Sequence, residues 1–331
     1  MIISRTPVRL SFFGGGTDYR QYFERQPGAV LGTTIDKYTY ISVNRLSDFF
    51  EYKIRVGYSK AELVNRVDDI QHPSVRETLK FMGHNGNLDI HIFADLPART
   101  GLGSSSSFTV GFLNALYALQ GKMVPRQQLA EEAIHIEQQR IQENVGCQDQ
   151  VHAAHGGMNI IEFSPKGIAV RPVVTSSEKT QLLSDSLLVF YTGQTRFASE
   201  IVKEQVDKTA ATSNDDYLAE MYRMVFRAEE VISAASTGET AAALGRLLHE
   251  SWELKKRLST QISNGLIDQA YDAALKAGAY GGKLAGAGGG GFLFFLAPKD
   301  RHDAIRRALS KLLEVKVGFE AEGTKIIYFT S

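Results

Sequence analysis

The sequence predicts an α+β protein built from two domains. Strand-like and helix-like segments are mixed in both halves of its 331 residues, a length that suits roughly two domains of ordinary size. We place the boundary near 175–185, which gives an N-terminal domain of residues 1–180 and a C-terminal domain of residues 181–331. No long flexible linker interrupts the chain, so we expect the two domains to pack against each other.

The N-terminal part begins with strand signals. Residues 2–13 alternate apolar and polar positions and run into the glycine turn 14–16, which predicts a strand that enters a turn. Residues 29–45 are rich in β-branched and aromatic side chains and predict a second strand or a hairpin. The alternation in residues 88–94 predicts another strand.

Helices and further strands follow. The spacing of apolar residues predicts helices over 104–119 and 126–143. Strand signals return in three segments: 157–163, 168–174 and 186–192. Residues 197–277 have an almost wholly helical pattern with three breaks, at 213–214, 236–238 and 263–265. The remaining predicted elements are strands at 282–284 and 291–297, a helix at 300–313 and a strand at 325–330.

The composition excludes several classes of protein. Basic and acidic residues balance at 37 each, so the net charge does not indicate a nucleic-acid or membrane-surface partner. The single cysteine, Cys147, rules out an intramolecular disulfide and a multi-cysteine zinc site. No stretch approaches the roughly 18 to 20 apolar residues of a membrane span, and residues 1–7 lack the pattern of a signal peptide. We therefore expect a cytoplasmic protein.

The most informative segment is Pro97-Ala98-Arg99-Thr100-Gly101-Leu102-Gly103-Ser104-Ser105-Ser106-Ser107. Glycines let the backbone approach a ligand closely, and we expect the serines to cap the helix that follows. The free N–H groups and the positive end of that helix suit a phosphate, and a serine hydroxyl there can reach Mg²⁺. The alternative is a flexible loop followed by a well-capped helix.

Two nucleotide-binding loops of other folds are absent from the sequence. No Gly-x4-Gly-Lys-Ser/Thr occurs, which argues against the P-loop NTPase fold. The turn 14–16 does not fit the dinucleotide pattern Gly-x-Gly-x-x-Gly, because Tyr19 occupies the last position. Residues 286–291 do fit it, but an apolar strand follows them rather than a helix, so this context excludes a Rossmann site.

Three glycine-rich segments resemble, in this order, the signature motifs of the GHMP kinases, the superfamily of galactokinase, homoserine kinase, mevalonate kinase and phosphomevalonate kinase. Residues 7–19 are similar to the galactokinase opening Pro-Gly-Arg-x-x-Leu-x-Gly-Glu-His-Thr-Asp-Tyr. The loop 97–107 is similar to Pro-x3-Gly-Leu-Gly-Ser-Ser-Ala, and residues 283–291 are similar to Lys-x-Thr-Gly-Ala-Gly-x-Gly-Gly. The resemblance covers nearly the whole chain. It implies the two-domain GHMP kinase fold, an active site in the interdomain cleft, and ATP and Mg²⁺ as cofactors.

Departures from the family pattern bear on the substrate. Ser106 stands where the superfamily usually has alanine, and Ala285 where it often has threonine. Gly15 and Gly16 replace the Glu-His pair of galactokinases, which argues against galactose. The combination of Phe-Gly-Gly-Gly-Thr-Asp-Tyr with Leu-Pro-Ala-Arg-Thr-Gly-Leu-Gly-Ser-Ser-Ser-Ser is similar to that of the D-glycero-D-manno-heptose 7-phosphate kinases.

That likeness implies transfer of a phosphoryl group to the anomeric (O1) hydroxyl of a heptose 7-phosphate. The product would be the 1,7-bisphosphate, on the route to GDP-heptose for surface polysaccharides. One alternative is another sugar-1-kinase of the superfamily, acting on fucose, arabinose or a uronic acid. The other is a non-catalytic sugar sensor on the same scaffold.

The predicted catalytic residues follow from the same resemblance. Glu137 lies at the edge of the apolar stripe of its predicted helix, and Asp149 follows twelve residues later near the end of a loop. Galactokinases have a matching Glu-x11-Asp-Gln arrangement, which implies that Glu137 and Ser105 bind Mg²⁺ and that Asp149 is the base or anionic orienter. Arg9 would stabilise charge on the moving phosphoryl group. The alternatives are a surface pair of Glu137 with Arg140, a turn role for Asp149 and a simple ion pair for Arg9.

The resemblance divides the binding residues between the two substrates. For ATP it implies Pro97, Gly101, Leu102, Gly103, Ser104, Ser105, Ser106 and Ser107. For the sugar it implies Thr17, Asp18, Gly286, Ala287, Gly288 and Gly289, with Asp18 accepting hydrogen bonds from sugar hydroxyls. A phosphorylated sugar also requires a cationic pocket, for which the candidates are Lys255, Lys256, Arg257 and Arg99. The alternative for the first three is a solvated helix face. We expect a sugar phosphate and ATP as partners, no nucleic acid and no membrane, and leave a homodimer open.

Overall fold

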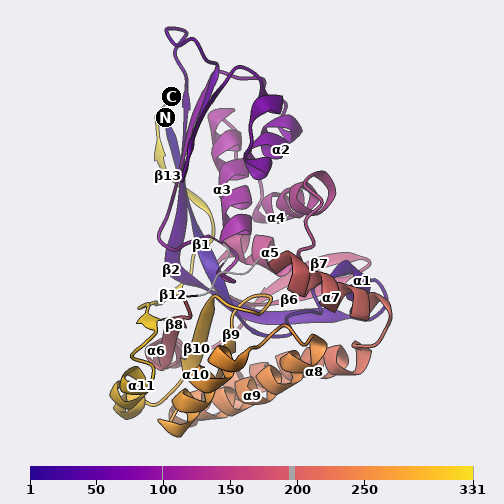
Figure 1. Ribbon diagram of the computed structural model, residues 1–331, viewed down its shortest axis with the longest axis vertical. Helices are drawn as coiled ribbons and strands as arrows, with labels where there is room; N and C mark the ends of the chain where they lie inside the picture. The colour runs from indigo at the N-terminus through magenta and orange to yellow at the C-terminus, as the bar shows by residue number, and fades with distance from the viewer. Residues whose placement is uncertain (99, 194–197, 331) are drawn as a thin grey trace.

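The computed structural model describes residues 1–98, 100–193 and 198–330, which form two β-sheets with helices packed against them (Figure 1). Within these residues the larger sheet has nine strands: β1 (Ile2–Phe13), β2 (Gly28–Arg45), β3 (Ile54–Gly57), β4 (Ala61–Val64), β5 (Leu88–Ala94), β6 (Met158–Ser164), β7 (Gly167–Pro172), β12 (Phe319–Glu320) and β13 (Lys325–Phe329). The smaller sheet has four strands in the same residues: β8 (Leu187–Tyr191), β9 (Gly281–Leu284), β10 (Phe292–Leu296) and β11 (Leu313–Glu314).

Strand β2 holds the larger sheet together. Its 18 residues pair antiparallel with β1 on one side, and on the other side with β6 in its first part and β5 in its second part. The strand order is β13-β1-β2-β5-β3-β4, and β7 pairs with β6. Alternate apolar residues of β2 such as Ile41 and Val43 are fully buried, as expected for a β-branched strand with one face on the core. The predicted segment 29–45 is therefore one long strand.

Helices cover one face of the upper part of this sheet (Figure 1). They and the neighbouring short helices are α1 (Arg20–Phe23), α2 (Pro73–Phe81), α3 (Ser104–Leu119), α4 (Arg126–His135), α5 (Gln148–His155) and a 3-10 turn at Val67–Asp69. Helix α3 is the central one. Its Phe112 packs in one cluster with Ile41 of the sheet and Leu79 of α2, and its Leu113 packs in another with Leu129 of α4. Because apolar contacts surround α3, its N-terminus has a fixed position in the molecule.

The smaller sheet has its own helices, which lie in the lower half of Figure 1. These are α6 (Ser177–Asp185), α7 (Ala198–Ala210), α8 (Asp215–Ala234), α9 (Thr237–Leu258), α10 (Gly265–Lys276), a 3-10 turn at Lys299–Arg301 and α11 (His302–Ala308). Strand β10 pairs with both β8 and β9 and is fully apolar, Phe292 to Leu296, because it is buried on both faces.

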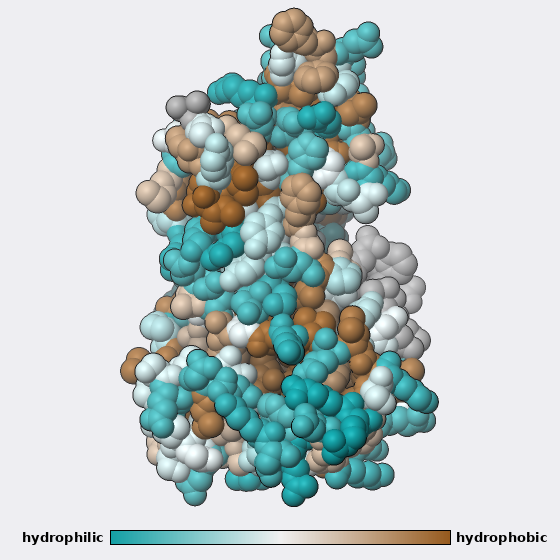
Figure 2. Space-filling view, turned by 90° about the vertical axis from the view of Figure 1, so that its left-hand side faces the viewer, coloured by the Kyte–Doolittle hydropathy of each residue, from teal (hydrophilic) through white to brown (hydrophobic). Residues whose placement is uncertain are grey.

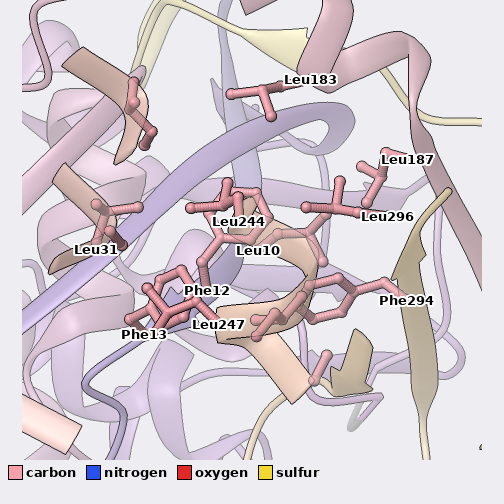
Figure 3. Packing of buried hydrophobic residues seen from close by; sticks show 14 of the residues in the cluster. Leu10, Phe12, Phe13, Leu31, Leu183, Leu187, Leu244, Leu247, Phe294 and Leu296 are labelled. Carbon is pink, nitrogen blue, oxygen red and sulfur yellow. The ribbon is translucent and has the colours of Figure 1, made fainter. Parts of the chain in front are cut away.

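The two sheets share one hydrophobic core (Figure 3). Leu10 and Phe12 of β1 pack in it with Phe294 of β10 and Leu247 of α9. The rings of Phe12 and Phe294 meet edge to face, with 5.8 Å between their centroids. A core that contains residues from both units holds them in one relative position, as the absence of a long linker led us to expect.

The end of the chain departs from the predicted division at residue 180. Strand β13 pairs antiparallel with β1, with Ile2 opposite Phe329, and β12 pairs with β2. Residues 319–329 therefore belong to the larger sheet, and a C-terminal domain of residues 181–331 is not a separate unit in space. By pairing with β1, β13 covers a strand that would otherwise lie at the edge of the sheet.

Two predicted helices are shorter than expected. The α-helix at 126–143 ends at His135 and continues as a π-helical turn over Ile136–Arg140. The helix at 300–313 ends at Ala308. Helices α2 and α6 and the short strands β3 and β4 were not predicted, because each contains too few residues for a clear periodic signal.

No helix in the described ranges is both long and apolar enough to cross a membrane. Figure 2 looks onto the sheet face opposite helices α2, α3 and α4, where apolar and polar side chains are mixed. Apolar side chains also occupy the tip of the molecule, which the connection between β2 and β3 forms. There Phe49 is 99% exposed, and on β5 Phe93 is 62% exposed. Phe49 lies at the end of the larger sheet that is remote from the smaller sheet, whereas Phe93 lies toward the opposite end of β5, two residues before Asp95.

Candidate active site

The second and third glycine-rich segments meet in space through their backbones. A Cβ atom at Gly101 would lie 2.5 Å from the carbonyl oxygen of Ala285, and one at Gly286 would lie 2.4 Å from the Cα atom of Gly101. Both glycines also have positive φ, at 84° and 71°. A residue with a side chain fits neither the space nor the backbone angle, so glycine is required at this contact. The two motifs, far apart in sequence, therefore form one surface.

The first motif joins the same surface. The backbone N–H of Arg9 donates to the carbonyl of Leu102 (3.0 Å), and its Nη1 donates to the carbonyl of Gly101 (2.7 Å). From the third motif, the buried ammonium of Lys283 donates to the carbonyl of Phe12 on β1 (3.1 Å). The sequence predicted no role for Lys283, and in the structure its hydrogen bond links the third motif to strand β1.

Helix α3 begins at this surface. Its N-cap is Gly103, in the left-handed conformation with φ of 77°, and no side chain of the described residues caps it. The predicted capping by serines is therefore wrong: the hydroxyl of Ser107 donates to the carbonyl of Pro7 (2.8 Å) and that of Ser106 donates to Glu137 (2.8 Å). Ser105 is exposed. The N-terminus of a 16-residue helix thus faces the site without a competing side-chain acceptor, which suits a phosphate group.

Asp149 lies beside that N-terminus. It occupies the first turn of helix α5 rather than the end of a loop, which corrects the sequence-based prediction. Arg9 donates to its Oδ1 from Nε (2.8 Å) and from Nη2 (2.6 Å). A Cβ atom at Gly103 would lie 3.0 Å from Asp149 Oδ2, so this oxygen points toward the start of α3. The Arg9 side chain is 6% exposed and that of Asp149 is 25% exposed. A buried guanidinium thus holds a carboxylate that is open to solvent on one side.

Glu137 is fully buried, which corrects its predicted place at the edge of the apolar stripe. It lies on the π-helical turn after α4, and the Ser106 hydroxyl (2.8 Å) and the Gln150 side-chain amide (2.6 Å) both donate to its Oε2. Its Oε1 is buried and has no hydrogen-bond partner of good geometry among the described residues, although the Thr109 hydroxyl lies close to the carboxyl group. Burial raises the pKa of Glu137 to about 7.

The surface pair that was the alternative for Glu137 does not form, because Arg140 lies over the ring of Phe81, with its Cζ 5.3 Å from the centroid. Glu137 is linked instead to the glycine loop, by the hydrogen bond from Ser106, the residue that departs from the family pattern. Gln150 was not predicted as a site residue. Its signal in the sequence was its position directly after Asp149. From one turn of α5, Asp149 reaches Arg9 and Gln150 reaches Glu137.

Thr17 and Asp18 form the turn of the first motif. The Thr17 hydroxyl donates to the carbonyls of Gly14 and Ala29 (both 2.8 Å), and Thr17 is fully buried. The Thr17 hydroxyl is therefore engaged within the protein, and its contact with substrate stays a prediction. Asp18 is 1% exposed, and its carboxylate accepts from the backbone N–H of Gly16 (3.0 Å) and the side-chain amide of Gln148 (2.9 Å). Burial and, to a smaller extent, the charge of Asp149 raise the pKa of Asp18.

Some residues of the third motif pack against the protein interior, and others are part-exposed at the candidate site. The backbone N–H of Gly289 donates to the carbonyl of Ile262 (2.8 Å), and a Cβ atom at Gly288 would lie 2.7 Å from the Cα of Ile262. Gly289 is buried, and its contact with substrate stays a prediction. Gly286, Ala287 and Gly288 are part-exposed.

The structure distinguishes three of the four candidate cations for a distal phosphate. Lys255 is 5% exposed and its ammonium donates to the carbonyl of Gly286. Lys256 pairs with Glu253 (2.8 Å) on the surface, and Arg257 lies over the ring of Tyr217. Arg99 lies outside the described residues. Of the three described candidates, Lys255 alone faces the glycine-rich segments.

A separate hollow of about 560 Å³ opens between the two sheets. Its lining is Lys37, Asp95, Leu96, Pro97, Tyr191, Phe292, Leu313 and Val315. Pro97 is the one residue of the predicted ATP site in this lining, and Arg9 and Asp149 are not part of it. We therefore place the candidate active site at the meeting of the three glycine-rich segments, where the charged residues converge, rather than in this hollow.

Comparison with known proteins finds one family in both parts of the chain. The pattern described as GHMP kinases N terminal domain matches residues 72–157, and the pattern described as GHMP kinases C terminal matches residues 231–315. Together the matches span more than half of the chain. The first includes Glu137 and Asp149.

The individual proteins that are similar to this chain are also kinases. A D-glycero-alpha-D-manno-heptose 7-phosphate kinase of Campylobacter jejuni subsp. jejuni is 28% identical, over 94% of this chain and 93% of that protein. The L-fucokinase/L-fucose-1-P guanylyltransferase of Bacteroides fragilis is 26% identical, over 92% of this chain but 35% of that protein. Among solved structures, a D-glycero-D-manno-heptose 1-phosphate kinase from Bacteroides thetaiotaomicron covers 100% of both chains, with a TM-score of 0.79 at 22% identity. A Lactococcus lactis galactokinase complexed with galactose covers 98% of this chain and 94% of that one, with a TM-score of 0.73 at 19% identity. Likeness to structures at these identities shows the fold.

Proposed function

Since the chain belongs to the GHMP kinases, which are ATP-dependent phosphotransferases, we propose that it phosphorylates the anomeric (O1) hydroxyl of D-glycero-D-manno-heptose 7-phosphate. The product would be the 1,7-bisphosphate, an intermediate on the route to GDP-heptose for surface polysaccharides. The observation that carries the proposal is the position of Asp149 Oδ2 beside Gly103, where helix α3 begins. It brings a carboxylate next to an anion-binding helix N-terminus, as phosphoryl transfer to an alcohol requires.

In the proposed reaction the acceptor hydroxyl lies between Asp149 and the γ-phosphate of ATP. Its oxygen attacks the γ-phosphorus, the bond from phosphorus to the oxygen of ADP breaks, and the hydroxyl proton passes to Asp149 Oδ2. Arg9 holds Asp149 through Oδ1 with two N–H groups, so the other oxygen keeps its orientation toward the acceptor. The same guanidinium places positive charge next to the reacting groups.

Mg²⁺ fits the residues present. The buried Oε1 of Glu137 has no partner within the described ranges, and the exposed Ser105 hydroxyl lies one residue before Ser106, which contacts the same carboxyl group. No cluster of three or more His, Cys, Asp or Glu in the described residues could hold a metal ion by itself. One carboxylate, one hydroxyl and nucleotide phosphates are an ordinary ligand set for Mg²⁺, which neutralises phosphate charge when bound.

A second candidate, a fucose-type sugar-1-kinase, is favoured by the likeness to the Bacteroides fragilis protein. A non-catalytic sugar sensor is the third, and Arg9, Glu137 and Asp149 in one site argue against it. The proposed reaction consumes ATP, so we propose that it takes place in the cytoplasm. A homodimer stays a prediction, which the mass of the purified protein in solution tests.

An acceptor panel distinguishes these candidates. ADP release would be measured with heptose 7-phosphate, free heptose, fucose, arabinose, galactose and a uronic acid, with Asp149→Asn as the control. We expect turnover with the phosphorylated heptose and a phosphate on the anomeric carbon in the NMR spectrum of the product. Turnover with fucose but not with the heptose phosphate would move the assignment to the second candidate. Sugar binding without ADP release from any member would favour the sensor.

A further inference from the structure

The side chain of Lys255 is a cation enclosed in the protein. It lies in the last turn of helix α9 and is 5% exposed, whereas the neighbouring Lys256 and Arg257 lie against aromatic rings on other sides of the helix. Its ammonium donates to the carbonyl of Gly286, and no ion pair joins it to a carboxylate in the described part of the chain.

Lys255 lies close to the residues of the proposed active site. Gly286 packs directly on Gly101 of the phosphate-binding loop. Burial lowers the pKa of Lys255 to about 8, and the charges of Arg9, Asp18 and Asp149 act on it as well. Lys255 therefore lies in the electrostatic field of Arg9 and Asp149, which the proposed reaction uses.

The hydrogen bonding of Lys255 is incomplete for a buried ammonium. The group has three N–H donors, and its hydrogen bond in the described structure goes to one neutral carbonyl. A buried cation is stable when it is paired and its donors are satisfied, so an anion at this position would offset the loss of hydration. The part-exposed loop at Gly286 leaves a side from which a ligand can approach.

We propose that the Lys255 ammonium binds a phosphate oxygen in the active site. The proposal rests on the proposed function and adds a residue to it. One source of the oxygen is the γ-phosphate of ATP, held on the loop that Gly286 contacts. The other is the phosphate that a sugar phosphate already carries. The alternative is a purely structural role, in which Lys255 only holds the Gly286 loop. The test must exclude this alternative.

The test compares Lys255→Met with Lys256→Met, a matched control on the adjacent surface position. Loss of a charge-assisted hydrogen bond to phosphate predicts an effect of about 10- to 100-fold. If the γ-phosphate is the partner, kcat falls by this factor with every acceptor, while the affinity for ADP is unchanged. If the sugar phosphate is the partner, the KM of the phosphorylated acceptor rises by this factor and that of its unphosphorylated analogue does not. We expect Lys256→Met to match the wild type.

A second variant keeps the proposal falsifiable if Lys255→Met does not fold. Lys255→Gln retains an N–H donor for the Gly286 carbonyl but has no charge, and ADP binding reports that its site is intact. Wild-type kcat and KM values in Lys255→Gln would overturn the proposal and leave Lys255 a structural residue. The proposed function is tested separately, because it fails when the wild-type protein releases ADP with no acceptor in the panel. In that case binding is the readout: Lys255→Gln must still weaken the binding of an ATP analogue relative to ADP, or of a sugar phosphate relative to the unphosphorylated sugar, and unchanged binding of both overturns the Lys255 proposal.

Discussion

The fully buried carboxyl group of Glu137 predicts that the metal-free protein loses stability as the pH rises. Burial raises its pKa from the ordinary value of 4.5 to about 7. A carboxyl whose pKa is higher in the folded state is protonated more readily there, so folding takes up a proton between these two values. The destabilisation is absent well below pH 4.5 and is fully present above about pH 7.

The magnitude follows from the two pKa values. With one pKa unit equal to about 1.4 kcal/mol, the ionisation of Glu137 lowers the free energy of unfolding by about 3 kcal/mol at pH 8 and by about 1 kcal/mol at pH 5. Glu137→Gln has the same shape and does not ionise, but it brings a buried amide with its own constant energy. The prediction is therefore the change with pH: the stability of Glu137→Gln relative to wild type should rise by roughly 2 kcal/mol from pH 5 to pH 8.

Urea unfolding at a series of pH values, with a chelator present, measures this change. Glu131→Gln is the matched control, because Glu131 is an exposed carboxylate on helix α4, which leads directly into the π-helical turn of Glu137. Its stability relative to wild type should stay constant over the same range. A relative stability of Glu137→Gln that is equally flat between pH 5 and pH 8 would refute the reasoning that Glu137 ionises with difficulty in the folded protein.

Three further substitutions test the site. Asp149→Asn should lower kcat by about 10²- to 10⁴-fold, the usual effect of a lost general base, while calorimetry finds the ADP affinity unchanged; near-normal turnover would remove Asp149 from this role. Gly101→Ala should lower the free energy of unfolding by several kcal/mol, because its Cβ would lie 2.5 Å from a carbonyl oxygen and its φ is 84°. The control Gly83→Ala has a similar φ of 69° but nothing within 4 Å of its Cβ, so it should cost about 1 kcal/mol. Similar costs for the two variants in urea unfolding would contradict the close approach of the two motifs. Gln150→Leu removes one of two donors to the carboxyl of Glu137 and should weaken Mn²⁺ binding, followed by electron paramagnetic resonance with ADP present, by about 10-fold; an unchanged affinity would show that the amide does not orient that carboxyl.

Much of the local structure could be predicted from the sequence. The helix at 104–119 and the strands at 2–13 and 88–94 have the predicted bounds, because their apolar spacing agrees with their surroundings in the fold. The order of the three glycine-rich segments also identified the family. These are properties of residue type and spacing, which are present in the chain before it folds.

The partners of the side chains could not be predicted. Thr17 and Asp18 have the types of residues that bind a sugar, yet the Thr17 hydroxyl donates to the carbonyl of Ala29 on β2, and the Asp18 carboxylate accepts from Gln148 of α5. Glu137 was expected at a boundary, but the π-helical turn buries it against Ser106, whose own hydroxyl was expected to cap the helix. In each case a contact with a segment remote in sequence decided which hydrogen bond formed.

The sequence by itself determined the fold class, most of the elements and the family of this protein. Only the tertiary structure decided that Asp149 faces the start of α3, that Lys255 rather than Lys256 turns inward, and that residues 319–329 return to the first sheet. The physical reason is the range of the interactions. Periodicity and turn chemistry act between residues a few positions apart, whereas burial and hydrogen bonding at the site depend on the packing of both sheets around one core.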